Sequence, residues 1–83
     1  LPSGTPGGFD LVAANLIASV LVALAAGLRD ELRPGGRLIA SGIFVDREGE
    51  VRDAFAGAGL RIVGRWGEGD WVALEAERPA AAR

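Results

Sequence analysis

One asparagine interrupts the most apolar stretch of the chain, the segment FDLVAANLI between Phe9 and Ile17. The side-chain amide of Asn15 offers one oxygen acceptor and an NH₂ donor, and the adjacent backbone carbonyl adds a second acceptor. Two such acceptors can hold the N–H groups of an incoming amine and aim its lone pair at an electrophile, without any titrating residue. Asparagine is also a preferred helix N-cap, and a helical pattern follows directly. The sequence therefore leaves two interpretations of Asn15 open, a helix cap and a ligand contact.

A second polar position, Ser41 followed by Gly42, ends the next apolar segment of the chain. The chain contains no histidine that could activate a serine, so we expect Ser41 to be a small polar strand end and not a nucleophile. Without histidine or cysteine the usual ligands of zinc and related metals are missing as well. We therefore expect no metal site.

The segments around Asn15 predict a strand followed by a helix. Residues 9–14 form a short apolar run without strict alternation, typical of a strand buried on both faces. From Ile17 onward, apolar residues recur at three- and four-residue steps, which predicts an amphipathic helix. The predicted apolar face of this helix comprises Ile17, Val20, Leu21, Leu24, Leu28 and Leu32. The sequence RPGG at residues 33–36 should stop it, because proline cannot continue a helix and glycine accepts a left-handed cap.

A second strand and a second helix follow the stop at residues 33–36. Residues 37–41 predict another buried strand. Asp46 is the expected N-cap of the next helix, with Glu48 and Glu50 in its first turn, where the helix dipole favours anions. The pattern of Val51 and Phe55 gives this helix an apolar face, and glycines at positions 57 and 59 should end it.

The last part of the chain predicts an antiparallel hairpin. Residues 60–66 and 71–77 are β-like and are separated by a short glycine-containing turn. We expect Glu68 and Asp70 to be turn residues. Trp66 and Trp71 flank the turn, where packing is the default expectation and stacking on a substrate is the alternative.

The order strand, helix, strand, helix, strand, strand predicts an α/β fold. Parallel strands are joined by right-handed crossovers, so two crossovers that step in the same direction place both helices on one face of the sheet. The opposite face should then be bare, and we expect another part of the full protein or a second copy of the chain to cover it. Ligands of open α/β sheets bind beyond the carboxyl ends of the strands. If the first two strands are neighbours, Asn15 and Ser41 lie together at that edge.

Length and charge set outer limits on the chain. Its 83 residues allow one small domain, and a net charge of −2 gives no general attraction to nucleic acid or anionic lipid. Residues 11–28 carry no charge, but a transmembrane helix is disfavoured because the run contains Asn15 and Ser19 and divides into two periodicities. We expect a loop or linker at residues 1–8, the domain at 9–77 and a disordered tail at 78–83. The chain has no methionine, and we expect it to be a piece of a longer protein.

The chain resembles the C-terminal half of class I S-adenosylmethionine-dependent methyltransferases, which have a Rossmann-like sheet. The resemblance rests on three stretches, FDLVAANLI, LRPGGRLIASGI and GEGDWVALE. More narrowly, they resemble the family that methylates the large-subunit ribosomal protein L11. The PGG turn is common to many methyltransferases, whereas the combination of ANL, SGI and WVAL in this order is more specific. The resemblance covers residues 9–77, and Asp70 stands where the family has glutamate.

The resemblance implies that Asn15 is the catalytic asparagine beside the methyl donor, and that Asn15 and Leu16 contact the cofactor, S-adenosylmethionine. It implies a cytoplasmic enzyme that methylates a ribosomal protein and contacts no nucleic acid directly. The main cofactor loop would lie upstream of Leu1, so we expect the isolated chain neither to bind the cofactor appreciably nor to transfer methyl groups. The alternative is a non-catalytic α/β interaction module. In either case the bare face and the free edge of the first strand should promote self-association.

Overall fold

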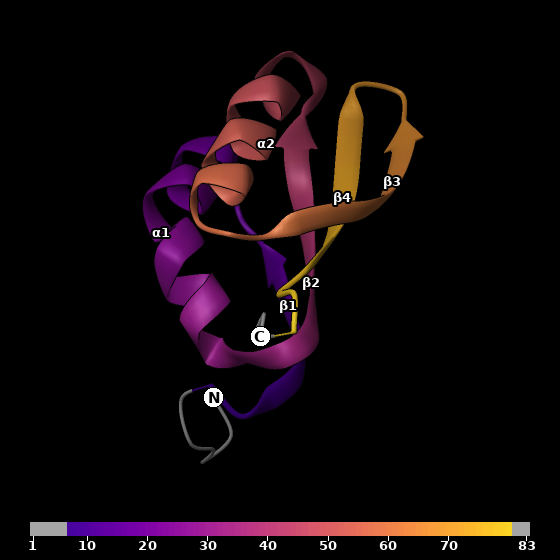
Figure 1. Ribbon diagram of the computed structural model, residues 1–83. Helices are drawn as coiled ribbons and strands as arrows, with labels where there is room; N and C mark the ends of the chain where they lie inside the picture. The colour runs from indigo at the N-terminus through magenta and orange to yellow at the C-terminus, as the bar shows by residue number, and fades with distance from the viewer. Residues whose placement is uncertain (1–6, 81–83) are drawn as a thin grey trace.

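Four strands form one mixed sheet, and two helices pack against one side of it (Figure 1). The structure, a computed structural model, describes residues 7–80. The elements are β1 (Phe9–Asn15), α1 (Ala18–Glu31), β2 (Leu32–Phe44), the 3₁₀ turn η1 (Val45–Arg47), α2 (Glu48–Gly57), β3 (Arg61–Glu68) and β4 (Trp71–Glu77). This is the order of elements that the sequence predicts.

The strands are arranged in the order β1-β2-β4-β3, with β1 parallel to β2 and with β4 antiparallel to both of its neighbours. Both crossovers, through α1 and through α2, step in the same direction across the sheet. Right-handed connections then place both helices on one face, as expected, and Figure 1 shows them side by side there. No described element lies on the other side, which we call the open face.

The face beneath the helices carries the hydrophobic core, and the described residues bury no polar side chain there. The core consists of Ala18, Leu21, Ala25, Leu32, Leu38, Ala40, Ile43, Val51, Phe55, Leu60, Val72, Leu74 and Ala76. The predicted apolar face of α1 is only partly correct, because Ile17 is 65% and Leu24 46% exposed. The buried stripe instead runs through Ala18, Leu21 and Ala25, whose small members let the helix lie close to the sheet.

Several predicted boundaries are wrong, for local reasons. The helix α1 ends at Glu31, before the proline, and the RPGG segment is extended within β2. The RPGG segment is extended because its backbone pairs with the residue that follows β4. The N–H of Gly35 donates to the carbonyl of Arg78, and the N–H of Arg78 donates to the carbonyl of Gly36. The turn η1 takes up Asp46, so Arg47 occupies the N-cap position of α2. The Arg47 side chain does not cap the helix and donates instead to the carboxylate of Glu50.

A β-bulge in β3 decides which side chains reach the open face. Ile62 pairs with the buried Ala76, but the register shifts at the next residue and Gly64 pairs with Glu75. A bulge of this kind turns the following side chains to the other face of the sheet. Trp66 and Glu68 thereby point to the open face. Most of the predicted loop at residues 1–8 and half of the predicted tail at 78–83 lie outside the described residues, and Arg78 forms backbone hydrogen bonds with Gly35 and Gly36.

Candidate functional site at the carboxyl edge of the sheet

Asn15 and Ser41 are register partners at the carboxyl ends of the parallel strands β1 and β2. The backbone N–H of Leu16 donates to the carbonyl of Ser41 at 3.2 Å, which ties the loop after β1 to the end of β2. The expectation that Asn15 and Ser41 lie together is confirmed, although Ser41 lies within β2 and not in a loop. In an open α/β sheet, this is the edge where ligands bind.

The interpretation of Asn15 as a helix cap is wrong. Ile17 occupies the N-cap position of α1, and no side chain caps that helix. Asn15 itself is the last residue of β1, and its side chain is exposed. All side-chain hydrogen bonds found within residues 7–80 are donated by arginines to carboxylates or backbone carbonyls. The amide of Asn15 is therefore free to contact a ligand.

Gly42 makes the room that the Asn15 side chain needs. Its φ of +84° lies in the left-handed region that L side chains rarely adopt. A Cβ at this position would lie 2.5 Å from Oδ1 of Asn15 and 3.3 Å from the carbonyl oxygen of Leu16. The sequence predicts the strand to end before Gly42 and gives no role to this residue, whereas the structure places it within β2, at the register shift between Ala40 and Ile43. The available signal was a glycine directly after the predicted strand.

Leu16, the residue after Asn15, packs its side chain into the core and leaves its carbonyl oxygen at the edge of the sheet. Its side chain is half-buried and packs against the core, which fixes the position of the loop. Its carbonyl oxygen lies beside Gly42, on the same side as the Asn15 amide oxygen. The site thus presents two oxygen acceptors held by backbone that is anchored on both sides.

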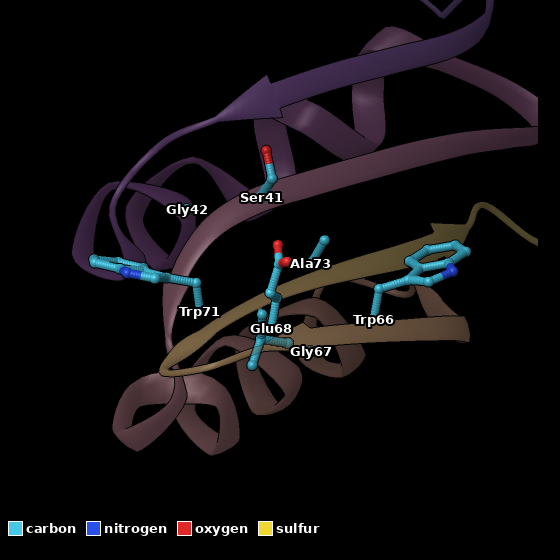
Figure 2. Close-up of a pocket in the computed structure, with 8 residues that line it drawn as sticks. Ser41, Gly42, Trp66, Gly67, Glu68, Trp71 and Ala73 are labelled. Atoms are coloured by element: carbon cyan, nitrogen blue, oxygen red, sulfur yellow. The ribbon is translucent and has the colours of Figure 1, made fainter.

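The other residues singled out in the sequence lie elsewhere. Asp10 is at the opposite end of β1 and forms an ion pair with Arg33. Trp66 does not pack as expected, because 54% of it is exposed on the open face. Trp71 is 57% exposed and touches Phe44 edge to face, with ring centroids 5.8 Å apart. Both indoles border a hollow next to Ser41 and Gly42, shown in Figure 2.

The strongest electrostatic cluster lies away from this site, between α2 and β3. The Arg65 guanidinium donates two hydrogen bonds to Glu48, and Arg52 donates a third. These bonds, that of Arg65 above all, hold the pKa of the Glu48 carboxyl below its usual value. Its side chain is only 14% exposed. The cluster ties α2 to the hairpin and contributes to stability.

Comparisons with known proteins give one consistent result. The sequence model of the family described as ribosomal protein L11 methyltransferase matches residues 2–79. The chain is similar to the ribosomal protein L11 methyltransferase of Chloroflexus aurantiacus, with 58% identity over 71 residues, which cover 86% of this chain and 22% of that protein. The corresponding protein of Thermus thermophilus is 50% identical over 68 residues, which cover 82% of this chain and 27% of that protein. The chain spans about a quarter of the length of these curated relatives.

Solved structures agree with the sequence comparison. A structure described as the ribosomal protein L11 methylase of Lactobacillus delbrueckii subsp. bulgaricus matches 95% of this chain and 41% of its own length, with a TM-score of 0.83 and 30% identity. The 16S rRNA N2 G1207 methyltransferase of Thermus thermophilus, solved with AdoMet and guanosine, matches 95% of this chain and 22% of its own length. Its TM-score is 0.64 at 24% identity, a likeness of fold alone. The predicted α/β architecture, the C-terminal half of a Rossmann-like methyltransferase sheet, is confirmed.

The structure also divides the uncharged run at residues 11–28 between a strand and a helix of 14 residues. Within residues 7–80, no helix has both the length and the apolar character needed to cross a bilayer.

Proposed function

Because the chain belongs to the ribosomal protein L11 methyltransferase family, we propose that it forms the C-terminal part of the catalytic domain of a protein methyltransferase. The intact protein would use S-adenosylmethionine to methylate amino groups of ribosomal protein L11. The main cofactor loop and the substrate-recognition domain would belong to upstream sequence, consistent with the share of the relatives that this chain covers.

The observation that carries the proposal is the exposed amide of Asn15 at the carboxyl edge, beside a Gly42 that keeps the space around Oδ1 open. S-adenosylmethionine supplies, when bound, a methyl group on a positively charged sulfur. Asn15 and Leu16 are the residues of this chain that would contact the methyl-donor end of that cofactor. The open space at Gly42 and the free amide fit such a contact.

The contribution of the chain to the chemistry is orientation. Oδ1 of Asn15 and the carbonyl oxygen of Leu16 accept the two N–H groups of a neutral substrate amine, which directs its lone pair toward the methyl group. Amide and carbonyl oxygens are not protonated at neutral pH. Asn15 and Leu16 would therefore orient the amine and would not act as an acid or a base. Fixing the reacting groups in this way can supply a large part of a rate enhancement.

Replacement of Asn15 tests this function in the intact protein that contains the chain. With Asn15→Ala we expect kcat for methylation of ribosomal protein L11 to fall about 100-fold, because misplacement of a reacting group costs on this order. The measurement is transfer of labelled methyl from S-adenosylmethionine. Ser19→Ala is the matched control, since it removes a polar group from an exposed position on the neighbouring helix and should leave the rate unchanged.

An unchanged rate in the Asn15→Ala protein would remove Asn15 from the mechanism. Wild-type protein that transfers no methyl group would instead favour the alternative, a non-catalytic interaction module. The exposed side chains of the open face, Leu11, Trp66 and Trp71, would then be its binding surface.

A further inference from the structure

Arg78, the residue directly after β4, fastens the end of the sheet that lies opposite the Asn15 site. Its Nη1 atom donates to the carbonyl of Leu32 at 2.6 Å and to the carbonyl of Arg29 at 3.3 Å. Both carbonyls belong to the C-terminal end of α1, where a helix leaves its last carbonyl groups unpaired and where its dipole favours a cation. Arg78 therefore stabilises the end of a helix from a different element of the fold.

The backbone of Arg78 is held at the same place. Its N–H donates to the carbonyl of Gly36 at 2.9 Å, and its carbonyl accepts from the N–H of Gly35 at 2.6 Å. Gly36 in turn lies so close to β1 that a Cβ there would be 2.9 Å from the carbonyl oxygen of Phe9. We call the backbone and guanidinium hydrogen bonds of this one residue the Arg78 clasp. It joins the end of β4 to the start of β2 and to α1.

A second arginine extends this connection to α2. Nη1 of Arg29 donates at 3.2 Å to the carbonyl of Ala58, which is the C-cap residue of α2. The backbone carbonyl of Arg29 is itself one of the acceptors of Arg78. Two guanidinium groups thus link the ends of β4, α1 and α2 to one another.

The strand order explains why this end of the sheet needs to be fastened. Among the described strands β3 pairs only with β4, and β4 connects it to β2. If β4 separates from β2, the whole β3–β4 hairpin leaves the sheet. The β2–β4 ladder is interrupted by a register shift between Ala40 and Ile43, and its longer part, from Arg37 to Ala40, ends next to Arg78. The clasp therefore holds the end from which this ladder would open.

The turn end of the hairpin is fastened less strongly. There the N–H of Val45 donates to the carbonyl of Asp70 at 2.7 Å. The rings of Phe44 and Trp71 touch, but 39% and 57% of these residues are exposed. Hydrogen bonds from a charged group contribute more to stability than those between neutral groups, and those of the clasp are partly buried. The clasp is therefore the stronger of the two attachments.

We propose that the Arg78 clasp is a conformational device that keeps the β3–β4 hairpin on the sheet, and that the hairpin opens as one unit when the clasp is lost. Proteins open locally in cooperative units that often coincide with such supersecondary motifs. The hairpin carries Trp66 and Trp71, which border the hollow beside Ser41 and Gly42. A contact at the far end of the strands thereby controls whether this wall of the hollow is in place. The inference does not rest on the proposed function.

Hydrogen–deuterium exchange of the intact protein that contains the chain tests this, with mass spectrometry of peptides from residues 60–80. In the Arg78→Ala protein we expect exchange in β3 and β4 to become about tenfold faster, because hydrogen bonds from a charged group are lost. Exchange in β1 and in the first half of α1 should stay within about twofold of wild type, because opening is confined to the hairpin. Arg78→Lys keeps the charge but not the planar fork of donors, so its effect should be intermediate.

Two other arginines provide matched controls. Arg37 lies on the same pair of strands and forms ion pairs with two glutamates of β4, but its side chain is 44% exposed. Arg37→Ala should therefore change exchange in the hairpin by less than about twofold. Arg29→Ala should accelerate exchange at the end of α2 and leave β4 unchanged, because the backbone carbonyl at this position remains available to Arg78.

Unchanged exchange in the Arg78→Ala protein would overturn this proposal. Acceleration spread equally over β1, α1 and the hairpin would also overturn it, since the chain would then open as a whole. Acceleration confined to residues 75–78, with β3 unchanged, would reduce the clasp to a local cap. An equal acceleration in the Arg37→Ala protein would show that any lost arginine contact has the same effect, and would likewise exclude a special role of Arg78.

Discussion

The two faces of the sheet carry aromatic side chains in opposite environments. On the covered face Phe55 is fully buried among aliphatic residues, and the described core contains no polar group. On the open face Trp66 and Trp71 are more than half exposed, and charged residues alternate with small ones. The covered face holds the fold together, whereas the larger side chains of the open face contribute little to the core of this chain. The comparison teaches that size and apolar character alone do not identify the core of this chain.

The largest expected effect is the difference in stability loss between truncating an aromatic residue on the covered face and truncating one on the open face. In the 83-residue chain, Phe55→Ala should lower the free energy of unfolding by about 3–5 kcal/mol, because it removes a fully buried ring and leaves a cavity. Trp66→Ala should lower it by about 1 kcal/mol or less, because the ring is 54% exposed. Urea denaturation followed by circular dichroism measures both. Equal losses would mean that the open face is packed in solution and would break the comparison.

A smaller loss of stability is expected from a substitution at Gly42, beside the Asn15 site. Gly42→Ala should cost about 2 kcal/mol, because alanine is strained at positive φ and its Cβ would collide with Oδ1 of Asn15. The same change should displace the Asn15 amide and reduce methyl transfer in the intact protein. Gly27→Ala, in the middle of α1 with no atom within 4 Å of the added Cβ, should instead stabilise the chain by about 0.5–1 kcal/mol. A Gly42→Ala protein with wild-type stability and activity would contradict this account of the site.

The smallest predicted effect concerns the ion-pair cluster between α2 and β3. The folded pKa of Glu48 lies below the unfolded value of 4.5, so its contribution is fully present above that pH and is lost as the pH falls through the folded pKa. Glu48→Gln should therefore cost about 0.5–1 kcal/mol at pH 7 after allowance for solvent screening, and the difference from wild type should shrink below pH 4.5. Urea midpoints measured at several pH values test this. A difference that stays constant down to pH 2 would exclude the electrostatic origin.

The sequence predicts the order of elements, the single covered face and the meeting of Asn15 with Ser41 because these follow from periodicity and from the handedness of crossovers. The buried stripe of α1 is not predictable in this way, since alanines at 18 and 25 pack closer to the sheet than the leucine at 24. The cap interpretation of Asn15 was wrong because the strand continues through this residue and the helix begins only at Ala18. The role of Gly42 depends on a φ angle and on a close approach between two strands, which a linear pattern does not contain.

The bulge at residue 63 also bears on how such a chain can change over evolutionary time. In a regular strand, one extra residue would exchange the covered and open faces for every residue that follows it. In β3 the extra residue is Val63, which has no register partner, so Arg65 still lies opposite the buried Leu74 and Trp66 opposite Ala73. The bulge thus absorbs one residue of additional length at a single point of the strand. Relatives of this chain can therefore differ by one residue in β3 while Arg65 keeps its contact with Glu48 and Trp66 stays on the open face.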